Sequence, residues 1–120
     1  MKEFEVQANI RLLATALGWR LWRNNVGVLK DDRGVPIRYG LANDSKFVNK
    51  SVKSGDLIGI RPVVITQEMV GSVIGQFVSV ECKREGWRPR ANDGQEQAQR
   101  RWKDVVNKLG GYAIISTGDL

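Results

Sequence analysis

The feature that most constrains the fold of this chain is an apolar run, residues 73–80, that ends directly in Glu81-Cys82-Lys83. If the run is a strand, side chains alternate between its two faces, so Glu81 and Lys83 point the same way. The two charges then lie together at the end of a strand that has apolar character on both faces. Charges in such surroundings need partners in a small domain, so the pattern predicts a polar site at this strand end.

A second carboxylate, Asp56, stands at the start of another short apolar run. If the two runs are neighbouring strands, Asp56 and Glu81 can bind a divalent cation, Mg²⁺ or Mn²⁺, with the backbone carbonyl of Cys82 as a third oxygen. Lys83 would position an attacking water or help to deprotonate it. Glu3, in the first helix, would support the metal site. The chemistry predicted for such a set is metal-assisted hydrolysis of a phosphodiester.

Plainer interpretations of the same residues stay open at this point. A Glu-x-Lys pair on a strand is often a solvated ion pair, and the motif by itself is weak. Asp56 can be a turn residue that follows Gly55, and Glu3 can simply favour the positive N-terminus of a helix. The catalytic interpretation depends on the combination of these motifs.

Composition narrows the chemistry further, because the chain has no histidine and only one cysteine, Cys82. This excludes hydrolases that need a histidine base, histidine-ligated zinc sites and internal disulfides. The net charge of +6 favours a polyanionic partner such as nucleic acid. Whatever catalysis occurs must use carboxylates, amines, amides, phenols and a bound metal.

Length and hydropathy predict one soluble domain. The 120 residues are enough for one core and too few for two, so a single domain over residues 1–120 is expected. No apolar run approaches the ~20 residues that a membrane span needs, and the N-terminus lacks the apolar segment of a secretory signal. A cytoplasmic protein with no membrane partner is therefore expected.

Hydrophobic periodicity predicts an α/β chain with a central mixed sheet flanked by helices, in the order α-β-β-β-α-β. Apolar residues three to four positions apart mark the helices, and alternating or continuous apolar runs mark the strands. The expected elements are a helix over residues 3–17, a strand over 19–23, loops over 24–34 and 42–55 around a short segment 35–41, a strand over 57–65, one helical turn over 66–71, the strand that ends in Glu81, a helix over 95–109 and a strand over 112–116.

Basic residues gather in two segments that are predicted to contact nucleic acid. One surrounds a tryptophan directly after the Glu-x-Lys motif, where the indole could stack on a base or lie in a solvated loop. The other is the polar segment 42–55. The expected nucleic-acid-binding residues are Arg84, Trp87, Arg88, Arg90, Lys46, Lys50 and Lys53.

Taken in order, these motifs resemble a VRR-NUC domain, the compact branch of the PD-(D/E)xK nuclease superfamily, in its small stand-alone phage and bacterial form. The resemblance covers nearly the whole chain, and the order of the motifs is more specific than any one of them. The matching segments are Glu3-Phe4-Glu5-Val6-Gln7, residues 18–27, Ser54-Gly55-Asp56-Leu57-Ile58-Gly59, Val80-Glu81-Cys82-Lys83-Arg84, and residues 99–102 through Leu109-Gly110-Gly111.

Carried over residue by residue, the resemblance implies that Asp56 and Glu81 bind divalent metal and that Lys83 is catalytic. It also implies that Glu3 supports the metal site and that Gln99 completes it. Gly55 replaces the proline of the superfamily's Pro-Asp pair, a change that is common in this branch. Two other glutamines of the same helix offer competing registers for the Gln99 position, namely Gln95 and Gln97.

The family also implies a fold and a biological setting. Its members have a restriction-endonuclease-like core, and the small stand-alone ones resemble Holliday-junction resolvases and tend to be homodimers. The expected activity is therefore Mg²⁺- or Mn²⁺-dependent cleavage of branched DNA by a homodimer, without a small-molecule cofactor. If the chain is encoded by a phage, it would act in the cytoplasm of the host cell.

Two other functions stay open. The chain could be a non-catalytic DNA-binding module, in which basic loops grip phosphates and the carboxylates are structural. It could also be a restriction-type endonuclease that reads a duplex sequence. Nothing in the residues excludes an RNA target, and nothing decides between one metal ion and two.

Overall fold

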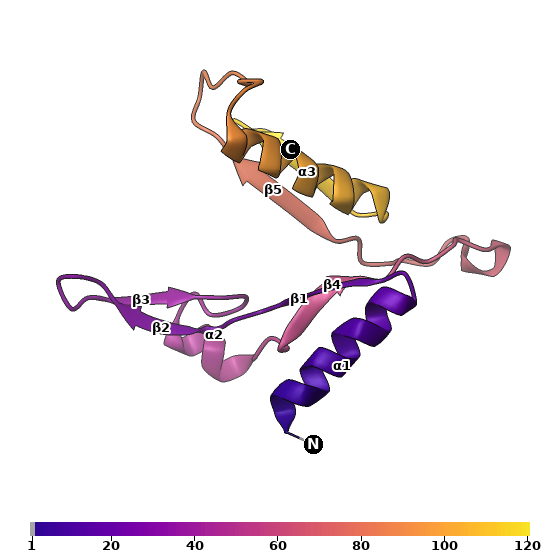
Figure 1. Cartoon of the computed structure of the whole chain (residues 1–120), viewed down its shortest axis with the longest axis horizontal. Helices are drawn as coiled ribbons and strands as arrows, with labels where there is room; N and C mark the ends of the chain where they lie inside the picture. The colour runs from indigo at the N-terminus through magenta and orange to yellow at the C-terminus, as the bar shows by residue number, and fades with distance from the viewer. Residues whose placement is uncertain (1) are drawn as a thin grey trace. The chain divides into compact units, whose positions relative to one another are not determined.

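The computed structural model describes residues 2–120, which divide into two compact units, Met1–Gly59 and Ile60–Leu120. These residues form three α-helices and six strands, and the strands pair as three separate two-stranded sheets (Figure 1). The prediction of a mixed α/β chain is confirmed. The single central sheet that was expected is not present among the described residues, where each strand pairs with only one other strand.

In the first unit, helix α1 (Glu3–Ala16) lies against strand β1 (Arg20–Arg23), close to the predicted bounds of both elements. The Glu5 carboxylate accepts a hydrogen bond of 2.8 Å from the backbone N–H of Lys2, which satisfies one of the free donors at the start of the helix. Gly18 follows the helix with φ +84°, a conformation that glycine adopts without strain, and the chain turns there into β1.

Strand β4 (Leu57–Ile60) pairs with β1, and the two backbones approach closely. A Cβ placed on Gly59 would lie only 1.8 Å from the carbonyl oxygen of Arg20, so this position requires glycine. Beyond the other end of the pair, the backbone N–H of Asn24 donates to the carbonyl of Asp56 at 2.8 Å. The residue before β4 is thereby tied to the residue after β1.

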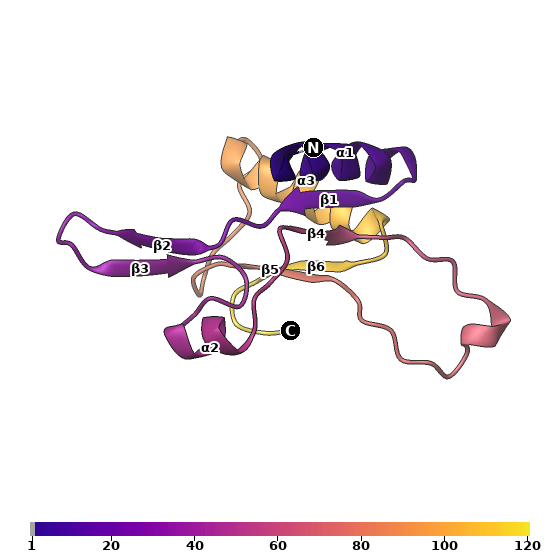
Figure 2. The ribbon, with the colours of Figure 1, turned by 90° about the horizontal axis from the view of Figure 1, so that it is seen from below.

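Segments that were predicted as loops contain a hairpin and a short helix, so those predictions were wrong. Strands β2 (Gly27–Lys30) and β3 (Pro36–Tyr39) form an antiparallel pair, and α2 (Lys46–Ser51) follows them (Figure 2). The Asp31 carboxylate accepts hydrogen bonds of 2.8 Å from two backbone N–H groups of the connecting loop. The polar residues that suggested a loop are the turn of this hairpin.

The base of the hairpin is held by a buried amide, Asn43, which is 2% exposed. Its Nδ2 donates to the backbone carbonyls of Gly27 and Tyr39, both at 2.8 Å. The guanidinium of Arg38 donates to the side-chain oxygen of Asn43 at 2.7 Å and to its backbone carbonyl at 2.9 Å. A buried amide satisfied in this way fixes the segment that leads into α2.

The second unit is built on a β-α-β arrangement of β5 (Val78–Cys82), α3 (Gly94–Lys108) and β6 (Tyr112–Ser116). The two strands are parallel, with Glu81 opposite Ile115 and Cys82 opposite Ser116, and α3 packs on both (Figure 1). Val106 of α3 is fully buried, and burial of such a side chain stabilises a fold by about 1.5–3 kcal/mol.

Residues 61–77, between the strands β4 and β5, are largely irregular. The strand predicted over residues 57–65 ends at Ile60, because Pro62 has no N–H to extend a ladder. The predicted helical turn appears as a 3₁₀ helix, η1 (Gln67–Met69), and regular pairing resumes only at Val78. Within residues 2–120, every helix is too short or too polar to cross a bilayer.

Candidate active site

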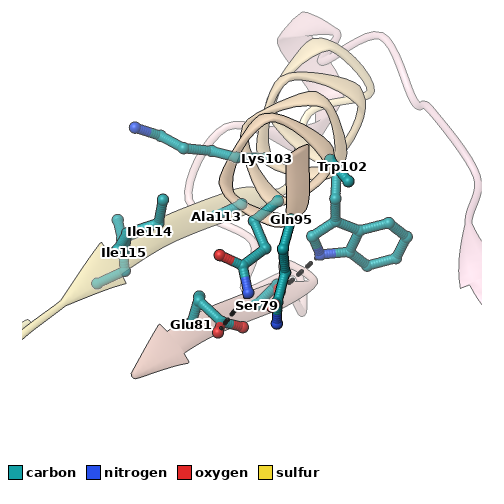
Figure 3. Close-up of a pocket in the computed structure, with 10 residues that line it drawn as sticks. Ser79, Glu81, Gln95, Trp102, Lys103, Ala113, Ile114 and Ile115 are labelled. Atoms are coloured by element: carbon teal, nitrogen blue, oxygen red, sulfur yellow. Dashed lines mark hydrogen bonds between the residues drawn. The ribbon is translucent and has the colours of Figure 1, made fainter. Parts of the chain in front are cut away.

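Strand β5 presents a polar face to helix α3. Alternation along the strand puts Ser79 and Glu81 on the side of the helix, and Lys83 continues that face just beyond the strand end. Figure 3 shows Ser79 and Glu81 side by side beneath α3, each joined by a hydrogen bond to a side chain of the helix. The prediction that Glu81 and Lys83 lie together is confirmed by an ion pair, since Lys83 Nζ lies 3.7 Å from Glu81 Oε1.

The carboxylate of Glu81 is held from two directions. Gln99 Nε2 of α3 donates to Glu81 Oε1 at 2.8 Å, and the Lys83 ammonium lies beside the same oxygen. The side chain of Glu81 is 42% exposed, so this ion pair contributes only about 0.2–1 kcal/mol to stability. The ion pair and the Gln99 hydrogen bond matter mainly because together they orient the Glu81 carboxylate.

The structure also distinguishes the three candidate glutamines of α3. Gln99 bonds to Glu81, and Gln95 lines the same pocket of about 400 Å³. Gln97 points to the loop before the helix, where its Nε2 donates to the carbonyl of Ala91 at 2.8 Å. The register that brings a glutamine to Glu81 is therefore that of Gln99.

Two oxygens of this site suit a hard divalent cation. Gln99 Oε1 is buried and has no hydrogen-bond partner among the described residues, because its own Nε2 is turned to Glu81. The Glu81 carboxylate is the second candidate source of oxygen ligands. Carboxylate and amide oxygens are ligands of Mg²⁺ and Mn²⁺, so the donor types fit such an ion.

Glu81 and Gln99 alone carry too little negative charge to bind a divalent cation. Glu81 and Lys83 together carry no net formal charge, and a dication needs more negative charge than this pair and one amide oxygen supply. Among residues 2–120, no group of three or more acidic or cysteine side chains is gathered closely enough to hold a metal ion. The predicted metal site therefore needs a further carboxylate, for which the sequence predicts Asp56.

Asp56 lies in the first unit, directly before β4, and its side chain is exposed. Glu3, also exposed, is the first residue of α1 in that unit. Glu81, Lys83 and Gln99 belong to the second unit. The structure brings these last three together, and the participation of Asp56 and Glu3 stays a prediction.

Asn24 has a role in the first unit that the sequence interpretation missed. Its Nδ2 donates to the hydroxyl of Ser54 at 2.7 Å and to the carbonyl of Gly55 at 2.9 Å, while its backbone N–H holds the Asp56 carbonyl. The turn that presents Asp56 is therefore fixed by one amide. The available signal was an Asn-Asn pair at the end of a predicted strand, which resembles an ordinary turn.

Cys82 was predicted to contribute its backbone carbonyl. Its side chain lies on the opposite face of β5 from Glu81 and is exposed, as the alternation requires. The next backbone N–H, that of Lys83, donates to Ser116 at 2.8 Å and so extends the ladder with β6 past Cys82. This bond fixes the backbone at the end of β5. Metal binding by the Cys82 backbone carbonyl stays a prediction.

The predicted nucleic-acid contacts fall into two groups. Lys46, Lys50 and Lys53 lie on or just after α2 in the first unit, and Lys53 Nζ is held by the side chain of Asn49 at 2.7 Å. The charged residues predicted to bind nucleic acid in the second unit lie exposed on the loop between β5 and α3. They are Arg84, Arg88 and Arg90. Both groups are accessible, and their contact with DNA stays a prediction.

Trp87 of the same loop is engaged within the protein. Its indole Nε1 donates to Glu96 Oε1 at 2.8 Å, and the Lys83 ammonium lies 5.6 Å from the centre of its ring. The indole is half-buried rather than free in solvent. Its use as a stacking surface for a base stays a prediction.

Glu96 is the second residue that sequence interpretation missed, and it is only 4% exposed. Burial alone would raise its pKa, but hydrogen bonds from the Trp87 indole and from the Arg90 N–H, with the Arg90 charge, lower the pKa below its ordinary value. Asp93 caps α3 by accepting from the Glu96 N–H at 3.0 Å, and this bond, despite partial burial, lowers the pKa of Asp93. An acidic residue three positions after a capping aspartate was the available signal.

Comparison with known protein families, curated proteins and solved structures returns no match for this chain.

Proposed function

We propose that this protein is a divalent-metal-dependent DNA endonuclease that hydrolyses phosphodiester bonds, selects branched DNA and acts as a homodimer. The observation that carries the proposal is the convergence of Glu81, Lys83 and Gln99 at one strand end, where the buried Gln99 Oε1 has no hydrogen-bond partner among the described residues. The resemblance of the motif order to VRR-NUC domains supports the same activity. A restriction-endonuclease-like core is part of this proposal.

Each residue has a chemical task in this proposal. When bound by Glu81, Gln99 and Asp56, Mg²⁺ or Mn²⁺ supplies Lewis acidity toward the phosphate and lowers the pKa of water. Gln99 holds the Glu81 carboxylate in one orientation through its 2.8 Å hydrogen bond. The Lys83 ammonium donates to the attacking water and stabilises negative charge on the reacting phosphate.

Homodimerisation follows from the expected product. One active site cuts one strand, so paired cuts across a four-way junction need two copies related by symmetry. Helix α1 leaves large apolar side chains exposed, which supports an interface with a second copy. They are Phe4, Leu12 and Leu13, each at least 60% exposed.

The proposal is tested by incubating the protein with labelled four-way junction, flap and linear duplex in Mg²⁺, Mn²⁺ or a chelator. We expect metal-dependent cleavage with the junction preferred. Lys83→Ala and Asp56→Asn should each lower the cleavage rate about 100- to 1,000-fold, because the first removes a cation that stabilises the transition state and the second removes a charged metal ligand. DNA affinity measured in chelator should stay close to that of the wild type.

Matched controls are available for both substitutions. Lys30→Ala and Asp32→Asn remove the same charges from exposed positions of the first unit and should leave cleavage unchanged. Full activity of Lys83→Ala would remove this residue from the mechanism. Salt-sensitive binding with no metal-dependent cleavage of any substrate would favour the non-catalytic DNA-binding module, and preference for one linear sequence would favour a restriction-type enzyme.

A further inference from the structure

Glu96 in the first turn of α3, Trp87 in the loop before that helix, and Lys83 after β5 contact one another in sequence. Glu96 accepts the Trp87 indole N–H at 2.8 Å, and the Lys83 ammonium lies over that indole, 5.6 Å from the centre of the ring. Lys83 in turn lies 3.7 Å from Glu81. All four residues belong to the second unit, so their arrangement depends on that unit alone.

Glu96 is fixed more firmly than a surface carboxylate. Its second oxygen accepts the backbone N–H of Arg90 at 2.7 Å, and the Arg90 guanidinium lies 3.7 Å from the first. Because both oxygens are engaged and the side chain is 4% exposed, the indole bonded to it has one defined orientation. A charge-assisted hydrogen bond of this kind restricts a ring more than packing alone.

The indole restricts Lys83 in its turn. A lysine side chain has four rotatable bonds, and its ammonium can reach many positions unless something limits it. An ammonium within about 6 Å of a tryptophan ring centre is attracted to the ring face. Lys83 is only 17% exposed, so the ring and Glu81 together confine its charged end.

We propose that Glu96 and Trp87 are positioning residues for Lys83: Glu96 orients the indole of Trp87, and the indole face holds the Lys83 ammonium beside Glu81. The catalytic consequence rests on the proposed function of Lys83. The geometric part stands on the second unit alone. On this account Trp87 acts through Lys83 rather than by stacking on a DNA base.

The geometric part is tested by NMR, without any cleavage measurement. A lysine above an indole shows ε-methylene signals shifted upfield by the ring current, and the Lys83 signals can be assigned by their loss in Lys83→Arg. We expect the shift in the wild type, its loss in Trp87→Leu, and its partial retention in Trp87→Phe, which keeps a ring. Glu96→Gln should retain the shift, since Gln Oε1 still accepts from the indole, and Glu96→Ala should lose it.

The catalytic part is tested by kinetics on the same variants. Trp87→Leu and Glu96→Ala should lower kcat about 10- to 100-fold, the usual effect of removing a supporting residue, with a smaller change in KM. Glu96→Gln should restore most of kcat. Glu85→Ala, which removes an exposed carboxylate from the same loop, should change neither value.

Each outcome has a distinct meaning. Lys83 signals at the position of exposed lysines in the wild type, or unchanged in Trp87→Leu, would overturn the proposal. A rise in KM with unchanged kcat in Trp87→Leu would overturn it in favour of a base-stacking role. If the NMR shifts behave as expected and the wild type cleaves nothing, the positioning of Lys83 stands and the nuclease function fails. Should Glu96→Ala not fold by circular dichroism, the Trp87→Leu and Trp87→Phe pair decides.

Discussion

Glu96 and Asn24, two polar residues that were not predicted as site residues, hold the segments next to Lys83 and Asp56 in place. Glu96 fastens the loop that follows Lys83, and Asn24 fastens the turn that precedes Asp56. Glu96 accepts from the half-buried Trp87 indole and from the Arg90 backbone, and Asn24 bonds to the Ser54 hydroxyl and to the backbone of the turn. Buried polar groups that are satisfied in this way specify local geometry more than they add stability.

Glu96 gives a testable pH dependence. Its folded-state pKa is lowered from the ordinary value of 4.5, and that of Asp93 from 3.8. A lowered pKa means that the folded state favours the charged carboxylate, so its contribution to stability is present above the ordinary pKa and is lost as the pH falls through the folded-state value. The melting temperature of the wild type should therefore drop steeply as the pH falls below about 4.5.

Glu96→Gln should make the melting temperature fall less steeply at acid pH, because the amide does not titrate. The measurement is the melting temperature by circular dichroism at a series of pH values. Glu85→Gln, at an exposed position of the same loop, is the control and should keep the slope of the wild type. Equal slopes for Glu96→Gln and the wild type would contradict the account of the Glu96 hydrogen bonds.

At the scale of elements, the pairing of β1 with β4 depends on one glycine. A Cβ on Gly59 would lie 1.8 Å from the Arg20 carbonyl oxygen and 2.8 Å from Leu21 Cα, both backbone atoms that cannot move aside cheaply. Gly59→Ala should therefore lower the free energy of unfolding by about 3 kcal/mol, within the range for overpacked sites.

Gly75→Ala is the matched control for this prediction. A Cβ there meets nothing within 4 Å, so the substitution should be neutral or stabilise by about 0.4–1 kcal/mol by restricting the unfolded chain. Both values come from urea unfolding followed by circular dichroism. A Gly59→Ala variant as stable as Gly75→Ala would show that β1 and β4 are not paired as described.

The sequence predicted the elements that have strong local signals. Helices α1 and α3, strands β1 and β6, and the turn at η1 lie within a few residues of their predicted bounds, because periodicity, caps and glycines mark them. The hairpin β2–β3 was missed because Asn43, distant in sequence from β2, holds its base. No local pattern reports a contact of that kind.

The site was predictable to a similar degree. Alternation along one strand was enough to place Glu81 and Lys83 on one face, and helical spacing left three glutamines open. Only the packing of α3 on β5 selects Gln99. Glu96 was not predicted because its carboxylate turns to Trp87 and Arg90 instead of to its own helix end.

At the scale of the whole molecule, the proposed function requires one carboxylate more than the second unit supplies. Glu81 and Lys83 nearly cancel in charge, and Gln99 adds a neutral oxygen. The carboxylate that the proposed function adds is Asp56, which lies on a turn of the first unit that Asn24 holds in place. Binding of one divalent ion by both carboxylates is therefore the central claim of this account.

Paramagnetic broadening by Mn²⁺ in a ¹⁵N-labelled sample measures this claim most directly. At substoichiometric Mn²⁺, we predict that the backbone amide signals of residues 55–57 broaden together with those of residues 81–83 and 99. Asp56→Asn should abolish the broadening at both places, whereas Asp32→Asn should leave it unchanged. Broadening near Glu81 alone, unaffected by Asp56→Asn, would contradict the claim.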